Sequence, residues 1–243
     1  NLIGEHTDYN GGHVFPCALT IGTYAVARLR EDDKLCLYSM NFEESGIGES
    51  RLADIEQKTE GDWRNYPKGI VWAFGKKGFE VTKGLDILYY GNIPNGSGLS
   101  SSASIEVLTG FILKKLFGFD VTNQDLALIG QFSENQYNGV NCGIMDQFAS
   151  VHGKAGNLMR LDCRSGEFQY FPWNPKGYKL VLINSCVKHE LVGSPYNDRR
   201  QSCENVVAAI AKNHPGVETL RDCDWTMLEE VKDVVSEEDI RRA

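Results

Sequence analysis

A glycine- and serine-rich stretch at residues 91–106, GNIPNGSGLSSSASIE, has the residue types that could hold a phosphate. Glycines at positions 96 and 98 would let the backbone approach a ligand closely. If a helix begins within the serines, the backbone N–H groups of residues 99–102 lie at its N-terminus, where the helix dipole favours an anion. The serine hydroxyls at 100–102 could also donate to phosphate oxygens. The alternative is a flexible, serine-rich turn.

This stretch has no lysine at the position where a P-loop places one. A Mg²⁺ ion could supply the positive charge instead, with one serine hydroxyl among its ligands. Glu134, at the end of a predicted helix, could complete such a metal site. The alternative for Glu134 is a solvated side chain at a helix end.

Glu5, His6 and Asp8 lie within four residues of a glycine-bounded segment at 1–12, NLIGEHTDYNGG. Carboxylates and an imidazole on a short loop can exchange hydrogen bonds with several hydroxyls of a polyol. A metal site is less well supported, because the segment lacks a second histidine at helical spacing. A capped surface turn is the remaining alternative.

Asp146 lies at the predicted start of a helix, inside the otherwise apolar run GIMDQF at 143–148. A carboxylate in such surroundings either caps the helix or acts as an acid/base group. The sequence alone leaves both interpretations open.

The elements that must position these residues follow from hydrophobic periodicity and turn residues. LDILYYG at 85–91 alternates as a strand and leads into the serine stretch, and residues 101–117 carry an apolar stripe at helical spacing. Thr122 can cap a further helix that runs to Gly139. Strands and helices alternate irregularly, which predicts an α+β fold with mixed sheets. The other predicted elements are strands at 22–29, 34–40, 157–163, 167–171 and 179–185, and helices at 61–75, from about Met145, and at 195–213.

The overall composition argues against several classes of protein. The 243 residues carry a formal net charge of −8 and have a pI near 5.2, so no basic surface is left for a nucleic acid. No apolar run approaches the roughly 20 residues of a membrane span, and no basic leader is present, so we expect a soluble, cytoplasmic protein. The seven cysteines have no C-x-x-C spacing, which argues against a disulfide framework and a zinc cluster.

A phosphate loop, a polyol-binding cluster and a poised carboxylate are together the parts of a small-molecule kinase, and the chain resembles the galactokinases of the GHMP kinase family. NLIGEHTDYNGG is similar to the galactokinase signature without its first residues, and GLSSSAS to the galactokinase form of the second GHMP motif. CGIMDQFAS at 142–150 is similar to the segment that carries the catalytic aspartate, and SPYNDRR at 194–200 to a stretch near the sugar. The resemblance extends from Asn1 to about residue 205.

The resemblance implies a role for each matching residue. Asp146 would bind the sugar and accept or orient the proton of its anomeric hydroxyl. Trp63 and Tyr66 match aromatic residues that line the adenine pocket, although two core aromatics one turn apart would have the same spacing. The other implied ligands are Glu5, His6, Asp8, Gly143 and Tyr196 for the sugar, Gly96, Gly98, Leu99, Ser100, Ser101 and Ser102 for ATP, and Ser102 and Glu134 for Mg²⁺.

The resemblance also implies a fold and an activity. We expect a GHMP-kinase-like fold of two interlocked lobes with the active site between them, an N-terminal domain at 1–185 and the start of a C-terminal domain at 186–243. The implied reaction is ATP- and Mg²⁺-dependent phosphorylation of galactose to galactose 1-phosphate, the first committed step of the Leloir pathway, by a monomer without nucleic-acid or membrane partners. Two alternatives are a galactose- and ATP-binding regulator without catalysis, and a GHMP kinase for a related sugar such as N-acetylgalactosamine. The intact Ser102 and Ala103 favour an enzyme.

Two parts of the family pattern are missing from the sequence. One is an arginine that galactokinases carry two residues before the position of Asn1, and the other is a glycine-rich third motif near the C-terminus. The chain also begins without methionine and ends in the helix-like segment EEDIRRA. We therefore expect a fragment of a longer protein, which by itself binds poorly and turns over little.

Overall fold

The computed structural model describes residues 1–94, 96–183 and 195–243. Its larger sheet has four strands in the order β2-β5-β3-β4, in which β3 and β5 are parallel and the other neighbours antiparallel. The strands span Thr23–Leu29 (β2), Lys34–Ser39 (β3), Gly48–Arg51 (β4) and Leu85–Gly91 (β5). This arrangement confirms the predicted α+β fold with mixed sheets.

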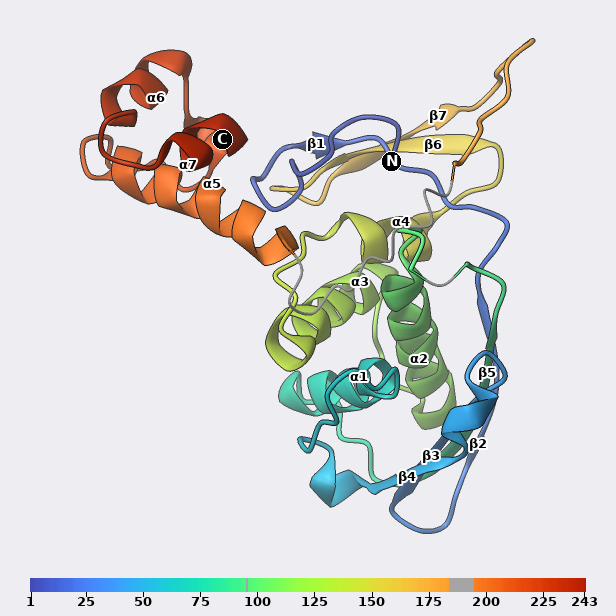
Figure 1. The fold of residues 1–243 in the computed structure, drawn as a ribbon. Helices are drawn as coiled ribbons and strands as arrows, with labels where there is room; N and C mark the ends of the chain where they lie inside the picture. The colour runs from blue at the N-terminus through green and yellow to red at the C-terminus, as the bar shows by residue number, and fades with distance from the viewer. Residues whose placement is uncertain (95, 184–194) are drawn as a thin grey trace.

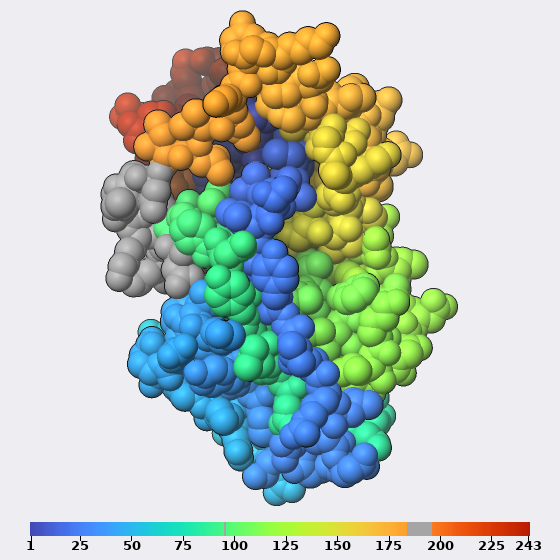
Figure 2. All heavy atoms as spheres, turned by 90° about the vertical axis from the view of Figure 1, so that its right-hand side faces the viewer, coloured from blue at the N-terminus to red at the C-terminus, as the bar shows by residue number. Residues whose placement is uncertain are grey.

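Helices cover one face of the larger sheet (Figure 1). Alternate residues of β5 point toward them, so Leu85, Ile87 and Tyr89 are buried in the main core. Figure 2 shows strands β2 and β5 on the surface that faces away from the helices. The helices of this layer are α1 (Asn65–Lys76), α2 (Ser101–Phe117) and α3 (Asn123–Phe132).

A smaller antiparallel sheet, in the order β1-β6-β7, joins the beginning of the chain to its middle. Val14 of β1 lies opposite Leu161 of β6, and both are buried. Helix α4 (Met145–His152) packs against this sheet through Phe148. The pairing therefore brings the segment at 1–12 close to α4. The strands span His13–Val14 (β1), Asn157–Asp162 (β6) and Phe168–Pro172 (β7).

Three further helices form a separate group, at the upper left of Figure 1. They bury Val206, Ile210 and Val231 among themselves. Arg221 ties this group to the rest of the chain, because its guanidinium donates to the Gly11 carbonyl at 2.8 Å and to the Asp162 carboxylate at 2.6 Å. The helices are α5 (Pro195–Ala211), α6 (Trp225–Val231) and α7 (Glu237–Arg242), and short 3₁₀ helices span Glu43–Ser45, Leu52–Asp54 and Leu220–Asp222.

Thr122 caps α3 as the sequence predicts, because its hydroxyl accepts from the Asp125 N–H while the Asp125 carboxylate accepts from the Thr122 N–H. The helical backbone ends at Gly139 as predicted, but its last part is not an α-helix. The α-helix ends at Phe132, and Ser133–Asn138 form a π-helical turn that Gly139, with φ of +79°, terminates. The wider turn buries the side chains of both Ser133 and Glu134.

The predicted strand at 179–185 is also wrong for the residues that the structure describes. Residues 179–183 form no strand, and their apolar side chains, such as Ile183, are exposed. A strand needs a hydrogen-bonding neighbour, and none is present for this segment within the described ranges. Residues 184 and 185 lie outside those ranges, as does the predicted domain boundary between 185 and 186, so the division into 1–185 and 186–243 stays a prediction. None of the described helices is long and apolar enough to cross a bilayer.

Candidate active site

The serine stretch forms a loop between β5 and α2, as predicted, and its backbone suits an anion. Gly96 and Gly98 have φ of +65° and +70°, and Ser100, at the N-cap position of α2, has φ of +59°. A Cβ on Gly98 would meet open space, so glycine is needed there for the backbone conformation alone. Ser101 begins α2, so the unpaired N–H groups of this helix lie in the loop. A non-glycine residue in the left-handed region costs energy and is typical of functional sites.

Asp146 is the second residue of α4, and Ile144 rather than Asp146 occupies the N-cap position. The structure therefore excludes the helix-cap interpretation of this carboxylate. Burial raises the pKa of Asp146, a hydrogen bond with Ser100 lowers it, and the nearby Asp8 carboxylate raises it. Asp146 thus lies between the serine loop and the segment at 1–12.

Asp8 reaches the same place from the segment at 1–12. Its carboxylate lies directly against Gly143, where a Cβ would overlap it. Burial raises the pKa of Asp8, and hydrogen bonds with the backbone of Tyr9 and Met145 oppose that rise. The bends of the segment are fixed by glycine and threonine, since the Thr7 hydroxyl lies 2.8 Å from the Gly4 carbonyl oxygen. The segment is therefore a folded loop that holds the half-buried Asp8 carboxylate against Gly143, and not a simple surface turn.

An aromatic cluster lies beside these carboxylates. The rings of His6 and Tyr9 lie 5.4 and 5.8 Å from the ring of Tyr196, which comes from the first turn of α5. His6 Nδ1 lies 2.7 Å from the Tyr9 hydroxyl. Burial and the Arg199 charge lower the pKa of His6, so its imidazole is neutral at neutral pH. Burial and the charge of Asp8 raise the pKa of Tyr196. Glu5 is exposed at the edge of this cluster.

Two buried carboxyl groups, Glu106 and Glu134, lie behind the serine loop. They are 0% and 3% exposed, and they hydrogen-bond to each other. Gln147 Nε2 donates to Glu134 Oε2 at 2.7 Å and lies 3.4 Å from Glu106 Oε2. Burial raises the pKa of Glu134 to about 7, and burial and the Glu134 charge raise the pKa of Glu106 well above its usual value. Near neutral pH the pair therefore retains at least one proton.

Sequence reasoning gave no role to Glu106, because a glutamate in a helix is usually solvated. The signal that could have found it is spacing, since Glu106 follows Ser102 by four residues and so lies on the same face of α2. Thr109 and Leu113 lie on that face too and are buried. Gln147 was passed over for a related reason, because nothing in GIMDQF distinguishes a buried amide from an exposed one.

A metal ion fits the oxygen atoms that Ser102 and Glu134 present. The Ser102 hydroxyl hydrogen-bonds with the Glu134 carboxylate, and both side chains are buried near the N-terminus of α2. Hard cations such as Mg²⁺ prefer oxygen ligands and often take one carboxylate together with substrate phosphates. No group of three or more His, Cys, Asp or Glu side chains within the described ranges is arranged as a metal site. A metal here would need further ligands from a bound nucleotide.

Trp63 lies two residues before α1, and Tyr66 is the second residue of this helix. The two side chains have different surroundings. Trp63 lies 6.3 Å, ring to ring, from Phe42 and 5.9 Å from Tyr89, at the edge of the main core. The charges of Glu134 and Glu106, together with burial, raise the pKa of Tyr66, which therefore lies near that pair. Their predicted place in an adenine pocket stays a prediction.

If a sugar binds beside Asp8, Gly143→Ala should weaken its binding by about 5- to 150-fold, because the added Cβ overlaps the Asp8 carboxylate and overpacking costs about 1–3 kcal/mol. Calorimetric titration of the full-length protein with galactose measures the change. Gly75→Ala is the matched control, since a Cβ at that position of α1 meets open space. Equal affinities for the Gly143→Ala variant and the wild type would contradict the contact.

Comparison with known proteins places this site in a family. Family models match the chain as the N-terminal domain of GHMP kinases at residues 65–154 and as the galactokinase galactose-binding signature at residues 1–29. Galactokinases of Clostridium acetobutylicum and Bacillus subtilis are 48% and 50% identical over 98% and 87% of this chain. The chain spans 61% and 54% of the lengths of these two relatives.

Solved structures agree with the sequence matches. A structure of Lactococcus lactis galactokinase complexed with galactose matches 100% of this chain and 62% of its own, with a TM-score of 0.92 and 40% identity. Methanococcus jannaschii mevalonate kinase, at 17% identity over 98% of this chain and 71% of its own, has a TM-score of 0.59 and shares the fold.

The fold, the serine loop at a helix N-terminus and the adjoining carboxylates define the class as that of the GHMP small-molecule kinases. This confirms the class that the sequence motifs predict. Within it, the chain is similar to the galactokinases over most of its own length.

Proposed function

We propose that the full-length protein transfers the γ-phosphoryl group of ATP to the anomeric hydroxyl of galactose and so forms galactose 1-phosphate, the first committed step of the Leloir pathway. The observation that carries this proposal is the position of Asp146. Its carboxylate hydrogen-bonds with Ser100 of the anion-binding loop and lies near Asp8 of the galactose-binding signature. A sugar hydroxyl and a phosphoryl group held by these two loops would meet at Asp146.

Each part of the site would then have one task. Asp8, His6 and Glu5 would bind sugar hydroxyls, with Tyr196 and the backbone at Gly143 forming the wall of the sugar site. Asp146, with its raised pKa, would accept or align the proton of the anomeric hydroxyl. The half-buried positions of Asp8 and Asp146 would limit the access of water to the transfer.

On the nucleotide side, the backbone at Gly96, Gly98 and Leu99 and the hydroxyls of Ser100 and Ser101 would hold the phosphates at the N-terminus of α2. Phosphoryl transfer depends mainly on positioning and electrostatics, which this helix end supplies. Trp63 and Tyr66 would line the adenine site. Ser102 and Glu134 would hold Mg²⁺, which when bound would offset charge on the phosphates.

ADP release by the full-length protein with Mg²⁺ and ATP tests this function, with galactose, glucose, N-acetylgalactosamine and mevalonate as separate acceptors. Turnover mostly confined to galactose is the expected result. Turnover on another acceptor would support kinase activity with a substrate other than galactose. Galactose binding without turnover on any acceptor would favour a regulator. We further propose a monomer in the cytoplasm, which light scattering and cell fractionation test.

A further inference from the structure

The first turn of α5 is hydrogen-bonded to the backbone of the loop at residues 139–142. The Asn197 amide makes two of these bonds, since its Nδ2 donates to the Gly139 carbonyl at 3.0 Å and its Oδ1 accepts from the Asn141 N–H at 2.9 Å. One side chain thus satisfies a donor and an acceptor of the loop, as a neighbouring strand would.

Arg200, one turn further along α5, binds the next two carbonyls of the same loop. Its Nη1 lies 3.0 Å from the Asn141 oxygen and 3.3 Å from the Cys142 oxygen. Glu204 accepts from Arg200 Nε at 2.8 Å and so fixes the direction of the guanidinium. The guanidinium also lies 5.7 Å from the centre of the Tyr9 ring, on the sugar side.

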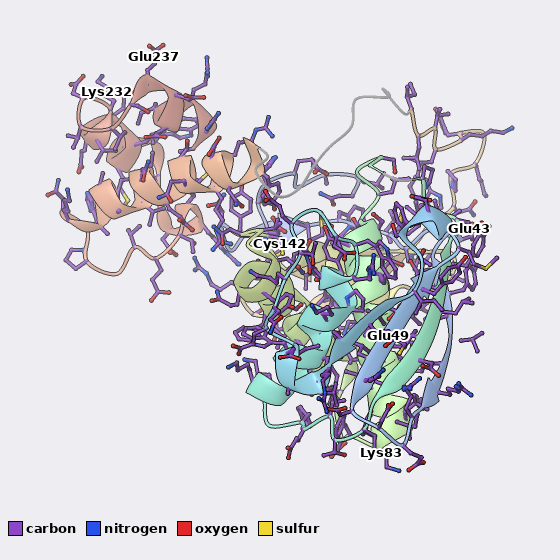
Figure 3. All side chains as sticks on the ribbon, turned by 60° about the horizontal axis from the view of Figure 1, so that its bottom comes forward. Glu43, Glu49, Lys83, Cys142, Lys232 and Glu237 are labelled. Atoms are coloured by element: carbon purple, nitrogen blue, oxygen red, sulfur yellow. The ribbon has the colours of Figure 1, made fainter. Side chains whose placement is uncertain are left out.

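The opposite side of this loop is held by the π-helical turn. The Asn135 Oδ1 accepts from the Cys142 N–H at 2.9 Å, and the Cys142 thiol lies 3.7 Å from Glu134 Oε2. Figure 3 labels Cys142 at the junction between the α5–α7 group and the rest of the chain. The loop is therefore held from both sides immediately before Gly143, against which Asp8 packs.

We propose that Asn197 and Arg200 are positioning residues for the sugar site: by fixing residues 139–142 they set the distance between Gly143, Asp8 and the α5 helix that carries Tyr196. Neither residue touches the reacting atoms in this proposal, which rests on the proposed function for the identity of the sugar. The four hydrogen bonds described above carry it, because they join the helix that supplies one wall of the sugar site to the loop that supplies another.

The test uses the full-length protein and the variants Asn197→Ala and Arg200→Ala. Each variant removes two hydrogen bonds to the loop, and the net contribution of two such bonds is about the 1.4 kcal/mol of a tenfold change, so the dissociation constant for galactose should rise about tenfold. The KM for ATP should change less than about twofold, because the bonds that are lost reach residues 139–142 and not the serine loop. Galactose affinity is measured by calorimetry without nucleotide, so the result does not depend on turnover. Gln201→Ala is the matched control on the same helix, since Gln201 bonds to Asn205 and not to the loop.

Several outcomes would overturn the proposal. Unchanged galactose affinity in both variants, or equal losses in galactose affinity and in the KM for ATP with a lowered Tm, would leave the bonds a merely structural role. If the alanine variants do not fold, Arg200→Lys replaces them, since lysine keeps the charge but cannot bond in the same forked geometry, and its galactose affinity should still fall. If the wild type itself binds no galactose, the proposed function is wrong and the positioning role cannot hold. If the wild type binds galactose and both variants bind it equally well, only the positioning role is wrong.

Discussion

Asp146→Ala in the full-length protein should lower kcat by about 10³-fold or more, a barrier increase of about 4 kcal/mol. The carboxylate lies where the galactose-binding signature meets the anion-binding loop, and burial gives it a raised pKa, as an acid/base group at neutral pH requires. Under the proposed function, its removal deletes the group that would orient the nucleophile. Galactose affinity should change much less, because Asp8 and its neighbours would still bind the ring. Steady-state kinetics, together with galactose titration of the same preparation, measure both effects.

Asp146→Asn and Asp233→Ala provide the comparison for this experiment. Asparagine keeps the shape and the hydrogen bonds but cannot accept a proton from the substrate, so it should be nearly as inactive as alanine. Asp233 is exposed, and its removal should leave kcat unchanged. Near-normal turnover of Asp146→Ala would remove Asp146 from its role.

Glu134→Gln should make the metal-free protein more stable at alkaline pH, by up to about 3 kcal/mol. The pKa of Glu134 is raised from 4.5 to about 7 by burial. Below about pH 4.5, both the folded and the unfolded chain hold this proton and the group has no effect. As the pH rises toward 7 the unfolded chain releases the proton while the folded chain retains it, so the free energy of unfolding falls. Above about pH 7 the full penalty is present.

Chemical denaturation in EDTA at pH 4.5, 6, 7 and 8 measures this difference between wild type and Glu134→Gln. Taking the difference cancels the groups of opposite behaviour, such as Asp222, whose pKa its ion pair with Arg164 lowers to about 2. Glu49→Gln is a control for the loss of an exposed carboxylate. Parallel stability profiles for wild type and Glu134→Gln would contradict a raised pKa at Glu134.

The parts of this site that the sequence predicts are those where local pattern and tertiary structure agree. The alternation of LDILYYG and the apolar stripe after Ser101 correspond to β5 and α2, so the loop between them lies where the sequence predicts it. The Thr122 cap is correct for the same reason, because a capping box needs only four consecutive residues. The kinase class followed from the resemblance of these motifs to those of galactokinases, since each motif taken alone left a structural interpretation open.

The parts that the sequence does not predict depend on contacts across the fold. Strand β4, GESR, has no hydrophobic alternation and is recruited by pairing with β3. Residues 179–183 include a continuous apolar run that favours a strand but have no strand partner among the described residues. Glu106 is polar and yet fully buried, because Gln147, 41 residues later, reaches it. Hydrogen bonds between distant segments leave no periodic trace in the sequence.

The contact between Arg221 and the Gly11 carbonyl has a consequence for synthesis of the chain. The two residues are 210 positions apart. A ribosome adds about 5–20 residues per second, so roughly 10–40 s separate their emergence. The strands of the larger sheet all lie within residues 23–91 and can pair much earlier. On a nascent chain the segment at 1–12 therefore stays without its distant partners while the sheet and its helices form, and the part of the candidate site that contains Asp8 is among the last parts of this chain to assemble.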